Sequence, residues 1–510
     1  MACLPRGVPR GKFNQAIARF VRILGEENVI VDSDKLAPYA KIMLAVPNER
    51  HEPSGALVVE NVEQIQAVMA ICNQFRIPFW PISTGRNFGY GSAAPATPGQ
   101  LVLDLRKMNK IIEVDPELGT ALVEPGVTYV QLVEYLKAHD LPFWPSFPSS
   151  GGITGPMGNL LDRGIGFNRH GEHAANFAGM EVVLADGTVL RTGMGGVEGS
   201  TTWQSYRWGF GPWLDGLFMQ SNFGVVTKIG IWLMKKPPAY KKFMVGLSDL
   251  EAAGRAVDVM RELRLQSILE TGVLGHSMYA LASKFRRSQI YQGEGAIPPE
   301  VFGNFLNQIG MPPWGVQAML YGTPERIEAD FSVVKEAFES IGGMVLWGAP
   351  LEGDMPGGHL FKNMIGEPNL EEFGIYNFRG GGGAMWLAPV VAPRAADVKR
   401  AYTLTDTIFR KWGFDFAGGF LVYARHTDMI CDLLFDRTDP AETQRAYACF
   451  NECIDALAAE GYGIYRVGTA FMDKVAETYG PAQREINRRL KRALDPRGII
   501  APGKSGIDIR

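Results

Sequence analysis

The stretch PISTGRNFGYG, residues 81–91, decides how the rest of the chain is interpreted. Its glycines allow backbone N–H groups to approach a pyrophosphate closely, and Arg86 and Asn87 add hydrogen-bond donors. The spacing is not G-x-G-x-x-G and no clear helix follows, so a Rossmann NAD site fits poorly. A second glycine-rich stretch, SSGGITGPMGN at 149–159, repeats the same feature. The two stretches together predict loops that hold a large anionic cofactor.

Three later segments add the chemistry of a phenol site: IYNFRGGGGAMW (375–386), IYRVGTAFMD (464–473) and IIAPGKSGID (499–508). Tyr465 and Arg466 follow a Gly-Tyr-Gly turn, and a phenolic hydroxyl beside a guanidinium can bind a phenolate. Tyr90, at the end of the first loop, can supply a second hydroxyl. A surface Tyr-Arg pair and a packed tyrosine are the structural alternatives. The combination indicates a flavin enzyme acting on a phenolic substrate.

Composition limits the classes of function. A chain of 510 residues is too long for one core and predicts two domains. A net charge of −3 argues against nucleic acid as a partner. No apolar run approaches the ~18–20 residues of a membrane span, and the start MACLPRGVPRGKF lacks the apolar stretch of a signal peptide. A cytoplasmic location is the expectation, and a periplasmic one together with a partner stays open.

The cysteines and histidines do not predict a metal or haem site. Five cysteines without regular spacing do not form a disulfide framework, and Cys449 and Cys453 are expected to pack on one helix face. His170 and His173 have metal-like spacing but no convincing third ligand. Because no C-x-x-C-H occurs, any c-type haem must come from another polypeptide. No metal is expected.

The pattern of elements predicts an α+β protein. Short strands and helices alternate up to the Lys-Lys-Pro-Pro run at 235–238. In this part, Asn61 is expected to cap a helix from about Val62 to Phe75, and Asp186-Gly187 to form the turn of a hairpin. Beyond it, helices are expected at Glu251–Leu263, Pro324–Ile341, Pro393–Trp412 and Pro440–Glu460. Isolated strands between them indicate an antiparallel sheet backed by helices. We therefore expect a cofactor domain from 1–237 and 462–510, and a substrate domain inserted at 238–461.

The chain also resembles the vanillyl-alcohol oxidase family of flavoproteins. The matching segments are GRNFGYGSAAP, VEPGVTY, GNLLDRGIGF, GMEVVLADGTVLRTGMGG, WGFGPWLDGLFMQSNFGVVTKIGIWLM, YNFRGGGGAMW, YRVGTAFMD and APGKSGID. They run in order from about residue 50 to the C-terminus. The resemblance implies a two-part FAD-binding domain with an inserted cap domain, which agrees with the boundaries predicted above.

The resemblance implies a cytochrome-linked enzyme with covalent FAD. By motif position, Tyr376 matches the tyrosine that carries the flavin, whereas the oxidases of the family use a histidine where this chain has Ala384. Ser150 stands where the oxidases have an aspartate. The electron acceptor would be a small c-type cytochrome subunit, and the flavoprotein would be a homodimer. The residues implied to bind FAD are Ser83, Thr84, Gly85, Arg86, Asn87, Ser150, Tyr376 and Lys504.

The resemblance also implies the residues of the substrate pocket. Tyr90, Tyr465 and Arg466 match the residues that bind the phenolate oxygen, and Lys504 matches a basic residue near the flavin N1/O2 edge. The implied pocket walls are Phe167, Glu372, Trp386, Gly419 and Ile430. Phe167 replaces the tyrosine usual in relatives, and Gly419 lacks a side chain that relatives have. We therefore expect a 4-alkylphenol larger than p-cresol.

The implied reaction begins with hydride transfer from the benzylic carbon of the bound phenolate to flavin N5. Water then adds to the resulting p-quinone methide, and positioning matters more than a strong protein base. Three alternatives stay open: an oxidase using O2, a flavin-binding protein without turnover, and a flavin 2-hydroxy-acid dehydrogenase. The last would need more cationic carboxylate clamps than Arg466 alone offers.

Overall fold

The computed structural model describes residues 3–149, 151–351 and 355–509. The first sheet is mostly parallel and leads directly into the loop at 81–91. Its strands, in spatial order, are β1 (Val29–Ile30), β2 (Gly55–Val58), β4 (Leu101–Asp104) and β3 (Phe79–Ile82). Helix α3 (Val62–Phe75) connects β2 to β3, and the side chain of Asn61 accepts a hydrogen bond from the Gln64 amide at 2.9 Å. This N-cap begins the helix where the sequence predicts it.

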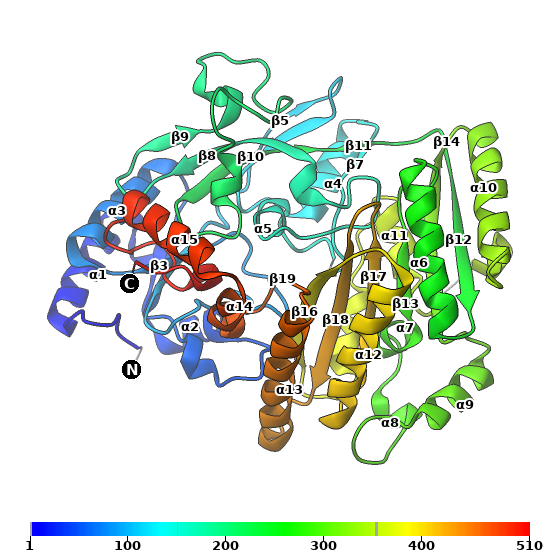
Figure 1. Ribbon diagram of the computed structural model, residues 1–510. Helices are drawn as coiled ribbons and strands as arrows, with labels where there is room; N and C mark the ends of the chain where they lie inside the picture. The colour runs from blue at the N-terminus through cyan, green and yellow to red at the C-terminus, as the bar shows by residue number, and fades with distance from the viewer. Residues whose placement is uncertain (1–2, 150, 352–354, 510) are drawn as a thin grey trace.

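The second sheet is antiparallel and lies above the first in Figure 1. Its strands, in spatial order, are β5 (Ile111–Asp115), β6 (Thr120–Val123), β10 (Val225–Trp232), β8 (Phe177–Val183) and β9 (Val189–Arg191). Gly187 takes φ +89° in the turn between β8 and β9, and Asp186 accepts a hydrogen bond from the Thr188 amide. The Asp-Gly pair therefore makes the predicted hairpin. A short pair, β7 (Phe143–Trp144) and β11 (Met234–Lys235), connects this region to the next.

The third sheet, called the large sheet below, has eight antiparallel strands. In spatial order they are β15 (Met344–Trp347), β12 (Ala239–Leu247), β14 (Trp314–Gly322), β13 (Val273–His276), β17 (Ala417–Val422), β18 (Thr427–Phe435), β16 (Gly383–Val391) and β19 (Ile464–Arg466). Long helices cover one face, as Figure 1 shows: α6 (Leu250–Leu265), α10 (Pro324–Glu339), α12 (Ala395–Lys411) and α13 (Pro440–Ala459). These helices lie within two residues of the predicted bounds. The predicted α+β fold class is confirmed.

Side chains on the large sheet alternate between two environments. Phe243, Val245 and Leu247 of β12 pack into the main hydrophobic core beneath the helices. Met244 and Gly246, between them, line a cavity on the opposite face. Because successive side chains of a strand point to opposite faces, one face of the sheet is core and the other is free to form a site.

The remaining helices connect the sheets and cover their edges. They are α1 (Arg10–Leu24), α2 (Ser33–Ala40), α4 (Tyr129–Ala138), α5 (Pro156–Leu161), α7 (Ser277–Ala282), α8 (Arg287–Ile290), α9 (Pro299–Ile309), α11 (His359–Met364), α14 (Met472–Thr478) and α15 (Pro481–Leu494). Within the described ranges, none of the helices has the length and apolar character needed to cross a bilayer.

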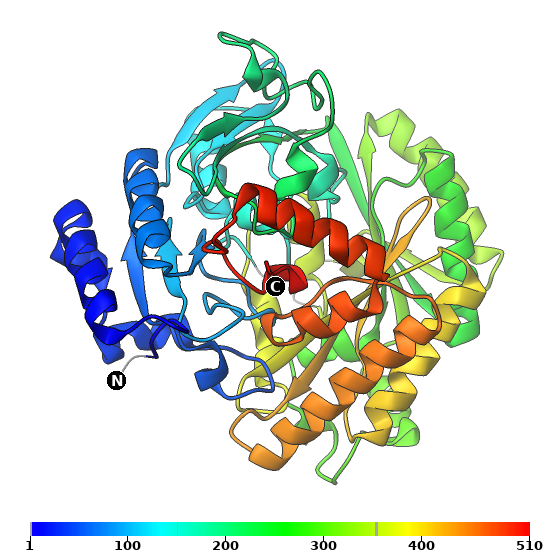
Figure 2. The ribbon, with the colours of Figure 1, turned by 60° about the vertical axis from the view of Figure 1, so that its left-hand side comes forward.

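The C-terminal segment returns to the first sheet, and Figure 2 shows it between the N-terminal part and the large sheet. The Phe79 amide donates to the Ile499 carbonyl at 2.8 Å, and the Ala501 amide donates to the Phe79 carbonyl at 2.7 Å. Lys491 and Asp495 form a fully buried ion pair at 2.7 Å that holds the turn before these residues. This return brings 499–508 beside 81–91. Strand β19, in contrast, pairs with β16 and extends the large sheet.

Candidate active site

One cavity of about 690 Å³ lies between the N-terminal loops and the free face of the large sheet. We call its two sides the loop wall (80–92, 154–162, Arg466 and Lys504) and the sheet wall (the cavity-side face of β12–β14 and β16–β18, together with Glu372, which also lines the cavity). Fourteen predicted site residues line it: Ser83, Thr84, Gly85, Arg86, Asn87, Tyr90, Phe167, Glu372, Trp386, Gly419, Ile430, Tyr465, Arg466 and Lys504. They come from distant parts of the chain, and the fold brings them to one place.

Glycines shape the loop wall through their backbone angles. Gly85, Gly89 and Gly91 have φ of +67°, +70° and +120°, a region that side-chain-bearing residues rarely adopt. A Cβ on Gly89 would lie 2.3 Å from the Trp386 ring, and one on Gly91 would lie 2.4 Å from the Thr469 hydroxyl. The loop at 81–91 therefore reaches its conformation only because these positions are glycine.

The second glycine-rich stretch lies against the first. A Cβ on Gly158 would lie 2.3 Å from the Ser83 hydroxyl, and one on Gly155 would lie 3.0 Å from the Thr84 methyl. Gly155 precedes α5, and both residues line the cavity. The two stretches thus form one continuous surface of small residues and backbone. Ser150, a predicted FAD-binding residue in this stretch, lies outside the described residues.

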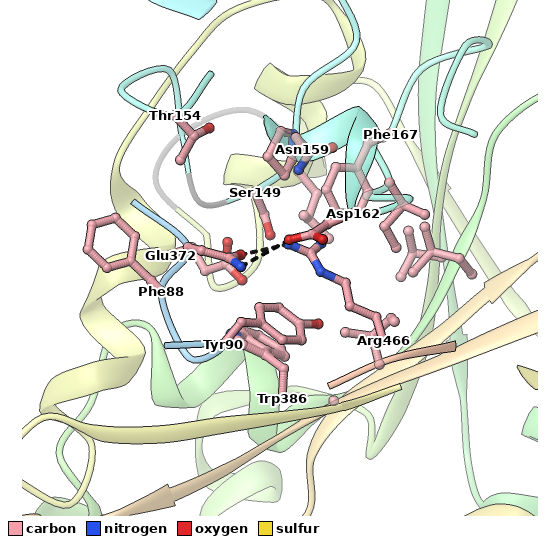
Figure 3. Close-up of a pocket in the computed structure, with 18 of the residues that line it drawn as sticks. Phe88, Tyr90, Ser149, Thr154, Asn159, Asp162, Phe167, Glu372, Trp386 and Arg466 are labelled. Atoms are coloured by element: carbon pink, nitrogen blue, oxygen red, sulfur yellow. Dashed lines mark hydrogen bonds between the residues drawn. The ribbon is translucent and has the colours of Figure 1, made fainter. Parts of the chain in front are cut away.

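Arg466 and Tyr90 form the polar centre of the cavity, as Figure 3 shows. The Arg466 guanidinium carbon lies 4.1 Å from the centroid of the Tyr90 ring, a cation–π contact. An Nη of Arg466 donates to the Asn87 side-chain oxygen at 2.7 Å, while its buried Nε has no hydrogen-bond partner among the described residues. Burial raises the pKa of Tyr90 to about 12, against the opposing effect of Arg466. Burial also raises the pKa of Tyr465. Both tyrosines are therefore neutral donors at physiological pH.

Asp162 connects the positive groups of the loop wall, and the sequence analysis did not identify it. Its carboxylate forms an ion pair with Lys504 and accepts a hydrogen bond from the Asn87 amide at 3.2 Å. Burial acts to raise the pKa of Asp162, but the charges of Lys504 and Arg466 hold it below the ordinary value. Asp162 lies in the quoted segment GNLLDRGIGF, where a lone acid among apolar residues was the available signal.

The sheet wall contains buried carboxyl groups whose pKa is raised, in contrast to that of Asp162. Glu372 is almost fully buried, and one of its oxygens accepts a hydrogen bond from the Tyr279 hydroxyl at 2.8 Å while the other has no partner among the described residues. Burial raises its pKa, and the hydroxyls of Ser149 and Tyr279 act in the opposite direction. Asp432 on β18 is fully buried, and its pKa is raised by burial and then by Glu372. Asp432 lies inside an apolar strand and was not predicted from the sequence.

Tyr376 does not line the cavity but packs directly behind it. Its ring stacks on Phe373 at 5.9 Å and lies 6.5 Å from Phe88 of the first loop. Burial raises the pKa of Tyr376, Glu372 raises it further, and a hydrogen bond from Trp386 acts in the opposite direction. Trp386 itself lines the cavity, so the Tyr376 hydroxyl lies one side chain away from it.

Gly419 lines the cavity, where its missing side chain was expected to widen the pocket. The close approach of β13 is a second reason for glycine at this position. A Cβ at this position would lie 2.5 Å from the Leu274 carbonyl oxygen and 2.9 Å from the Gly275 Cα of the neighbouring strand. Any side chain at 419 must therefore displace β13. Phe167 and Ile430 both line the cavity and pack against the same small hydrophobic cluster, so the cavity is apolar at this point. The substitution Gly419→Glu would consequently disturb the sheet as well as the cavity.

The cavity fits the group that the sequence predicts. The loop wall offers three cationic side chains, Arg86, Arg466 and Lys504, of which Lys504 is paired with Asp162. It also offers the Nε of Arg466, which has no hydrogen-bond partner among the described residues, and glycine positions that a Cβ would fill. Such a surface suits the phosphates and the polar ring edge of a flavin. The sheet wall offers Trp386 and aliphatic side chains, which suit an aromatic substrate.

The two histidines with metal-like spacing each contact polar groups of the protein. His173 contacts Asn159 and Ser146 through its two ring nitrogens, and burial lowers its pKa to about 3. His170 lies beside the Trp232 carbonyl at 3.3 Å. The described residues contain no group of three or more His, Cys, Asp or Glu side chains arranged to hold a metal ion.

Comparison with known proteins agrees with this geometry. The FAD binding domain family matches residues 53–193, and the family of FAD linked oxidases, C-terminal domain, matches 375–505. The flavoprotein subunit of 4-cresol dehydrogenase (hydroxylating) from Pseudomonas putida is 47% identical over 511 residues, covering 100% of this chain and 98% of the relative. The fold and the site thus define an FAD-dependent oxidoreductase.

Two solved structures are similar over their whole length. The crystal structure of p-cresol methylhydroxylase with substrate bound has a TM-score of 0.98 at 46% identity and covers 100% of this chain and 99% of that one. The 4-ethylphenol oxidase from Gulosibacter chungangensis, in its isoeugenol complex, has a TM-score of 0.95 at 32% identity, with 99% of each chain covered. The chain belongs to the vanillyl-alcohol oxidase family, in the group of p-cresol methylhydroxylase flavoproteins.

Proposed function

We propose that this protein oxidises and hydroxylates the benzylic carbon of 4-alkylphenols and passes the electrons to a c-type cytochrome. The observation that carries the proposal is the contact of Arg466 with Tyr90 in a cavity that Tyr465 also lines. A phenol oxygen placed between these groups would receive two hydroxyl donors and a positive charge. The names of the 4-cresol and 4-ethylphenol enzymes support the substrate class.

In the proposed reaction, the chain's main task is to bind the substrate as a phenolate. Arg466 lowers the pKa of the bound phenol by charge, and Tyr90 and Tyr465 donate hydrogen bonds to its oxygen. The negative oxygen pushes electrons into the ring and makes the benzylic hydrogen a hydride donor. FAD, when bound, supplies the hydride acceptor. Trp386 and Ile430 position the ring, and water adds to the benzylic carbon of the p-quinone methide to give the alcohol.

We assign the remaining predicted roles as part of the same proposal. Residues 1–237 and 462–510 would hold FAD, and 238–461 would cover the substrate. Ser83, Thr84, Gly85, Arg86, Asn87 and Ser150 would contact the cofactor, and Lys504 would hold a positive charge at its polar ring edge. Phe167, Glu372 and Gly419 would line the substrate pocket. The match of the FAD binding domain family to 53–193 supports this division.

Tyr376 would carry the flavin covalently through its oxygen. Its hydroxyl lies beside Trp386 at the end of the cavity, next to Phe88 of the first loop. Denaturing the flavin-loaded protein and separating it from free FAD tests this role. The yellow chromophore should stay with the wild-type chain and leave the Tyr376→Phe chain. A chromophore lost equally from both would reject the covalent link.

The electron acceptor would be a small cytochrome subunit, as the words "flavoprotein subunit" in the relative's name support. The flavoprotein would form a homodimer that binds this cytochrome. Light scattering of the purified flavoprotein, alone and with the cytochrome, measures both assemblies. A monomer that binds no cytochrome would reject this part of the proposal.

The central experiment mixes flavin-loaded protein with 4-ethylphenol without oxygen and then adds air, followed by cytochrome c. Rapid bleaching of the flavin, slow recovery in air and rapid recovery with cytochrome would support the proposal. Failure of any phenol to bleach the flavin would reject it, and reduction by a 2-hydroxy acid instead would favour the dehydrogenases of that class.

A matched pair of variants tests the binding role of the phenol site. Tyr465→Phe should lower kcat/KM for 4-ethylphenol by about tenfold to a hundredfold, since a hydrogen bond to a charged group is worth about 1.5–3 kcal/mol. Tyr462→Phe, three residues earlier, is the control because the Tyr462 hydroxyl lies near Asp397 and outside the cavity. Equal losses in both variants would contradict the assignment.

The second candidate function is an oxidase that returns the electrons to O2. The similarity to the 4-ethylphenol oxidase, with a TM-score of 0.95, is the observation that favours it. Recovery of the flavin within one turnover time in air alone would establish the oxidase, and Ala384 would then not exclude that activity.

A further inference from the structure

Four glycines from four different strands form a single row across the sheet wall. Gly246 of β12 pairs with Gly315 of β14, Gly315 pairs with Gly275 of β13, and Gly275 pairs with Gly419 of β17. All four line the cavity. We call them the glycine row. With strands ~4.8 Å apart, the row extends over three spacings, or roughly 14 Å.

At the centre of the glycine row, the backbone angles do not require glycine, and the missing side chains leave open space. None of the four has a positive φ. A Cβ on Gly275 would have its nearest neighbour at 4.0 Å, and a Cβ on Gly315 would have ordinary contacts at 3.5 Å or more. Both positions could hold a side chain, and that side chain would occupy the cavity. The missing side chains therefore make a trough in the floor of the cavity.

The neighbouring row of the sheet forms an apolar wall along the trough. It consists of Leu346, Met244, Gln317, Val273 and Leu421, which pair across the strands in that order. Gln317 is the polar member, and its amide donates to the Gly357 carbonyl at 3.1 Å, so it is already satisfied. Met311 and Pro312 line the cavity as well. A trough with these walls suits a hydrocarbon and offers nothing to a phosphate.

The trough begins where the proposed phenol site ends. Across the large sheet, the lining residues follow the order Tyr465 on β19, Trp386 on β16, Ile430 on β18 and then Gly419 on β17. Ile430 and Gly419 are direct cross-strand partners. At its far end the row reaches Met344, which pairs with Gly246 and is 54% exposed. The trough thus runs from the substrate pocket toward the outer edge of the sheet.

We propose that the glycine row binds the para substituent of the substrate, and that this substituent is an uncharged chain longer than ethyl. This inference rests on the proposed function, since it places the phenol oxygen at Tyr90, Tyr465 and Arg466. Chain atoms lying on Gly419, Gly275 and Gly315 would be removed from water along the whole row. Affinity should then rise with chain length and level off once the chain reaches Gly246 and the exposed edge.

The test uses alkyl esters of 4-hydroxybenzoate as ligands of the flavin-loaded protein. Their para carbon is a carboxyl carbon without hydrogen, so they bind without being oxidised, and calorimetry measures their Kd. In the wild type, the heptyl ester should bind at least tenfold more tightly than the methyl ester. In Gly275→Val, the ratio of the two affinities should fall at least tenfold, because the added methyl groups occupy the trough. Gly315→Ala provides a second, milder obstruction.

Gly322→Val is the matched control, because Gly322 ends β14 outside the cavity and a Cβ there meets only the flexible Arg326 side chain at 3.3 Å. Its affinity ratio should equal the wild-type ratio. No gain with chain length in the wild type, or equal weakening of both esters in Gly275→Val, would overturn the proposal; the latter result would make the trough an entry route. If the ratio behaves as expected while 4-ethylphenol fails to bleach the flavin, the trough stands and the proposed oxidation fails.

Discussion

The buried carboxyl groups on the two walls of the cavity have pKa values shifted in opposite directions. On the loop wall, Asp162 is paired with Lys504 and lies near Arg466, and its pKa is held below the ordinary value. On the sheet wall, Glu372 and Asp432 form no ion pair with any described residue, and burial raises the pKa of each. One wall is therefore organised to be charged and the other to be neutral. The difference shows how one cavity can hold an anionic cofactor and a hydrophobic substrate side by side.

The same two walls use glycine for different physical reasons. On the loop wall, Gly89 and Gly91 have positive φ and lie in contact with other side chains. On the sheet wall, Gly275 and Gly315 have ordinary backbone angles and face open space. The first kind of glycine is required by the fold, whereas the second kind sets the size of the cavity. Substitutions can separate the two.

The largest expected effect tests the neutral character of the sheet side. Asp428 of β18 lies in the row next to the glycine row, paired with Leu421, and burial, with Glu172, raises its pKa from 3.8 to about 7. An unfolded aspartate loses its proton near pH 4, so the wild type loses stability as the pH rises from about 4 to 7. Asp428→Asn removes this loss. The change that this substitution makes in the free energy of unfolding should therefore be about 4 kcal/mol more favourable at pH 8 than at pH 4. Thermal unfolding at both pH values measures it.

A stabilisation of Asp428→Asn that is the same at pH 4 and pH 8 would contradict the titration of this group. A destabilisation at pH 8 would show that the carboxylate is charged and paired in the folded protein. In that case the sheet side would resemble the loop wall, and the contrast between the two would be lost.

The second prediction tests the charged character of the loop wall. Asp162→Asn removes the partner of Lys504 and should lower the free energy of unfolding at pH 7 by about 3 kcal/mol, because it leaves a mostly buried cation without its pair. The pKa of Asp162 is depressed, so the stabilisation is present above the unfolded pKa and is lost as the pH falls through the folded one. The gap to the wild type should therefore close below pH 4.

A double-mutant cycle checks the cause of that loss. In a Lys504→Met background, Asp162→Asn should cost less than it does in the wild type, since the ion pair is already absent. Equal costs in both backgrounds would show that Asp162 acts through some other contact.

Local patterns in the sequence predict most of the fold. The Asn61 cap, the Asp186-Gly187 turn and the four long helices depend on neighbours a few residues apart, and the structure places them as predicted. The sequence also identified Tyr90, Tyr465 and Arg466 as site residues, because they stand in recognisable segments, and all three line the cavity. In these places, residue type and short spacing carry the structural information.

The partners that the sequence analysis missed depend on contacts between distant segments. Asp162 is notable only because Lys504, more than 300 residues later, folds against it. Asp432 appears in an apolar strand that gives no hint of a burial site near Glu372. The glycine row joins residues 246, 275, 315 and 419 through sheet register, which no local pattern specifies.

The third prediction concerns the conformational glycines. Gly89→Ala places a Cβ 2.3 Å from the buried Trp386 ring at a φ of +70°, so strain and overpacking should lower the free energy of unfolding by about 2 to 3 kcal/mol. Thermal unfolding and flavin content measure the effect. Gly461→Ala is the matched control, with φ +81° but no atom within 4 Å of the Cβ, and it should lose only about 1 kcal/mol. Equal losses would mean that the contact with Trp386 does not matter.

The smallest expected effect completes the comparison on the sheet wall. Gly315→Ala adds a Cβ whose nearest neighbour is the Val245 carbonyl at 3.5 Å, and its backbone has no positive φ. Alanine also loses less conformational freedom on folding than glycine, so the free energy of unfolding should change by less than about 1 kcal/mol, in either direction. Thermal unfolding beside Gly89→Ala gives the contrast directly. A loss as large as that of Gly89→Ala would mean that the packing of the sheet requires the glycine row. The open space beside the row would then be a consequence of that packing and not a site shaped for a ligand.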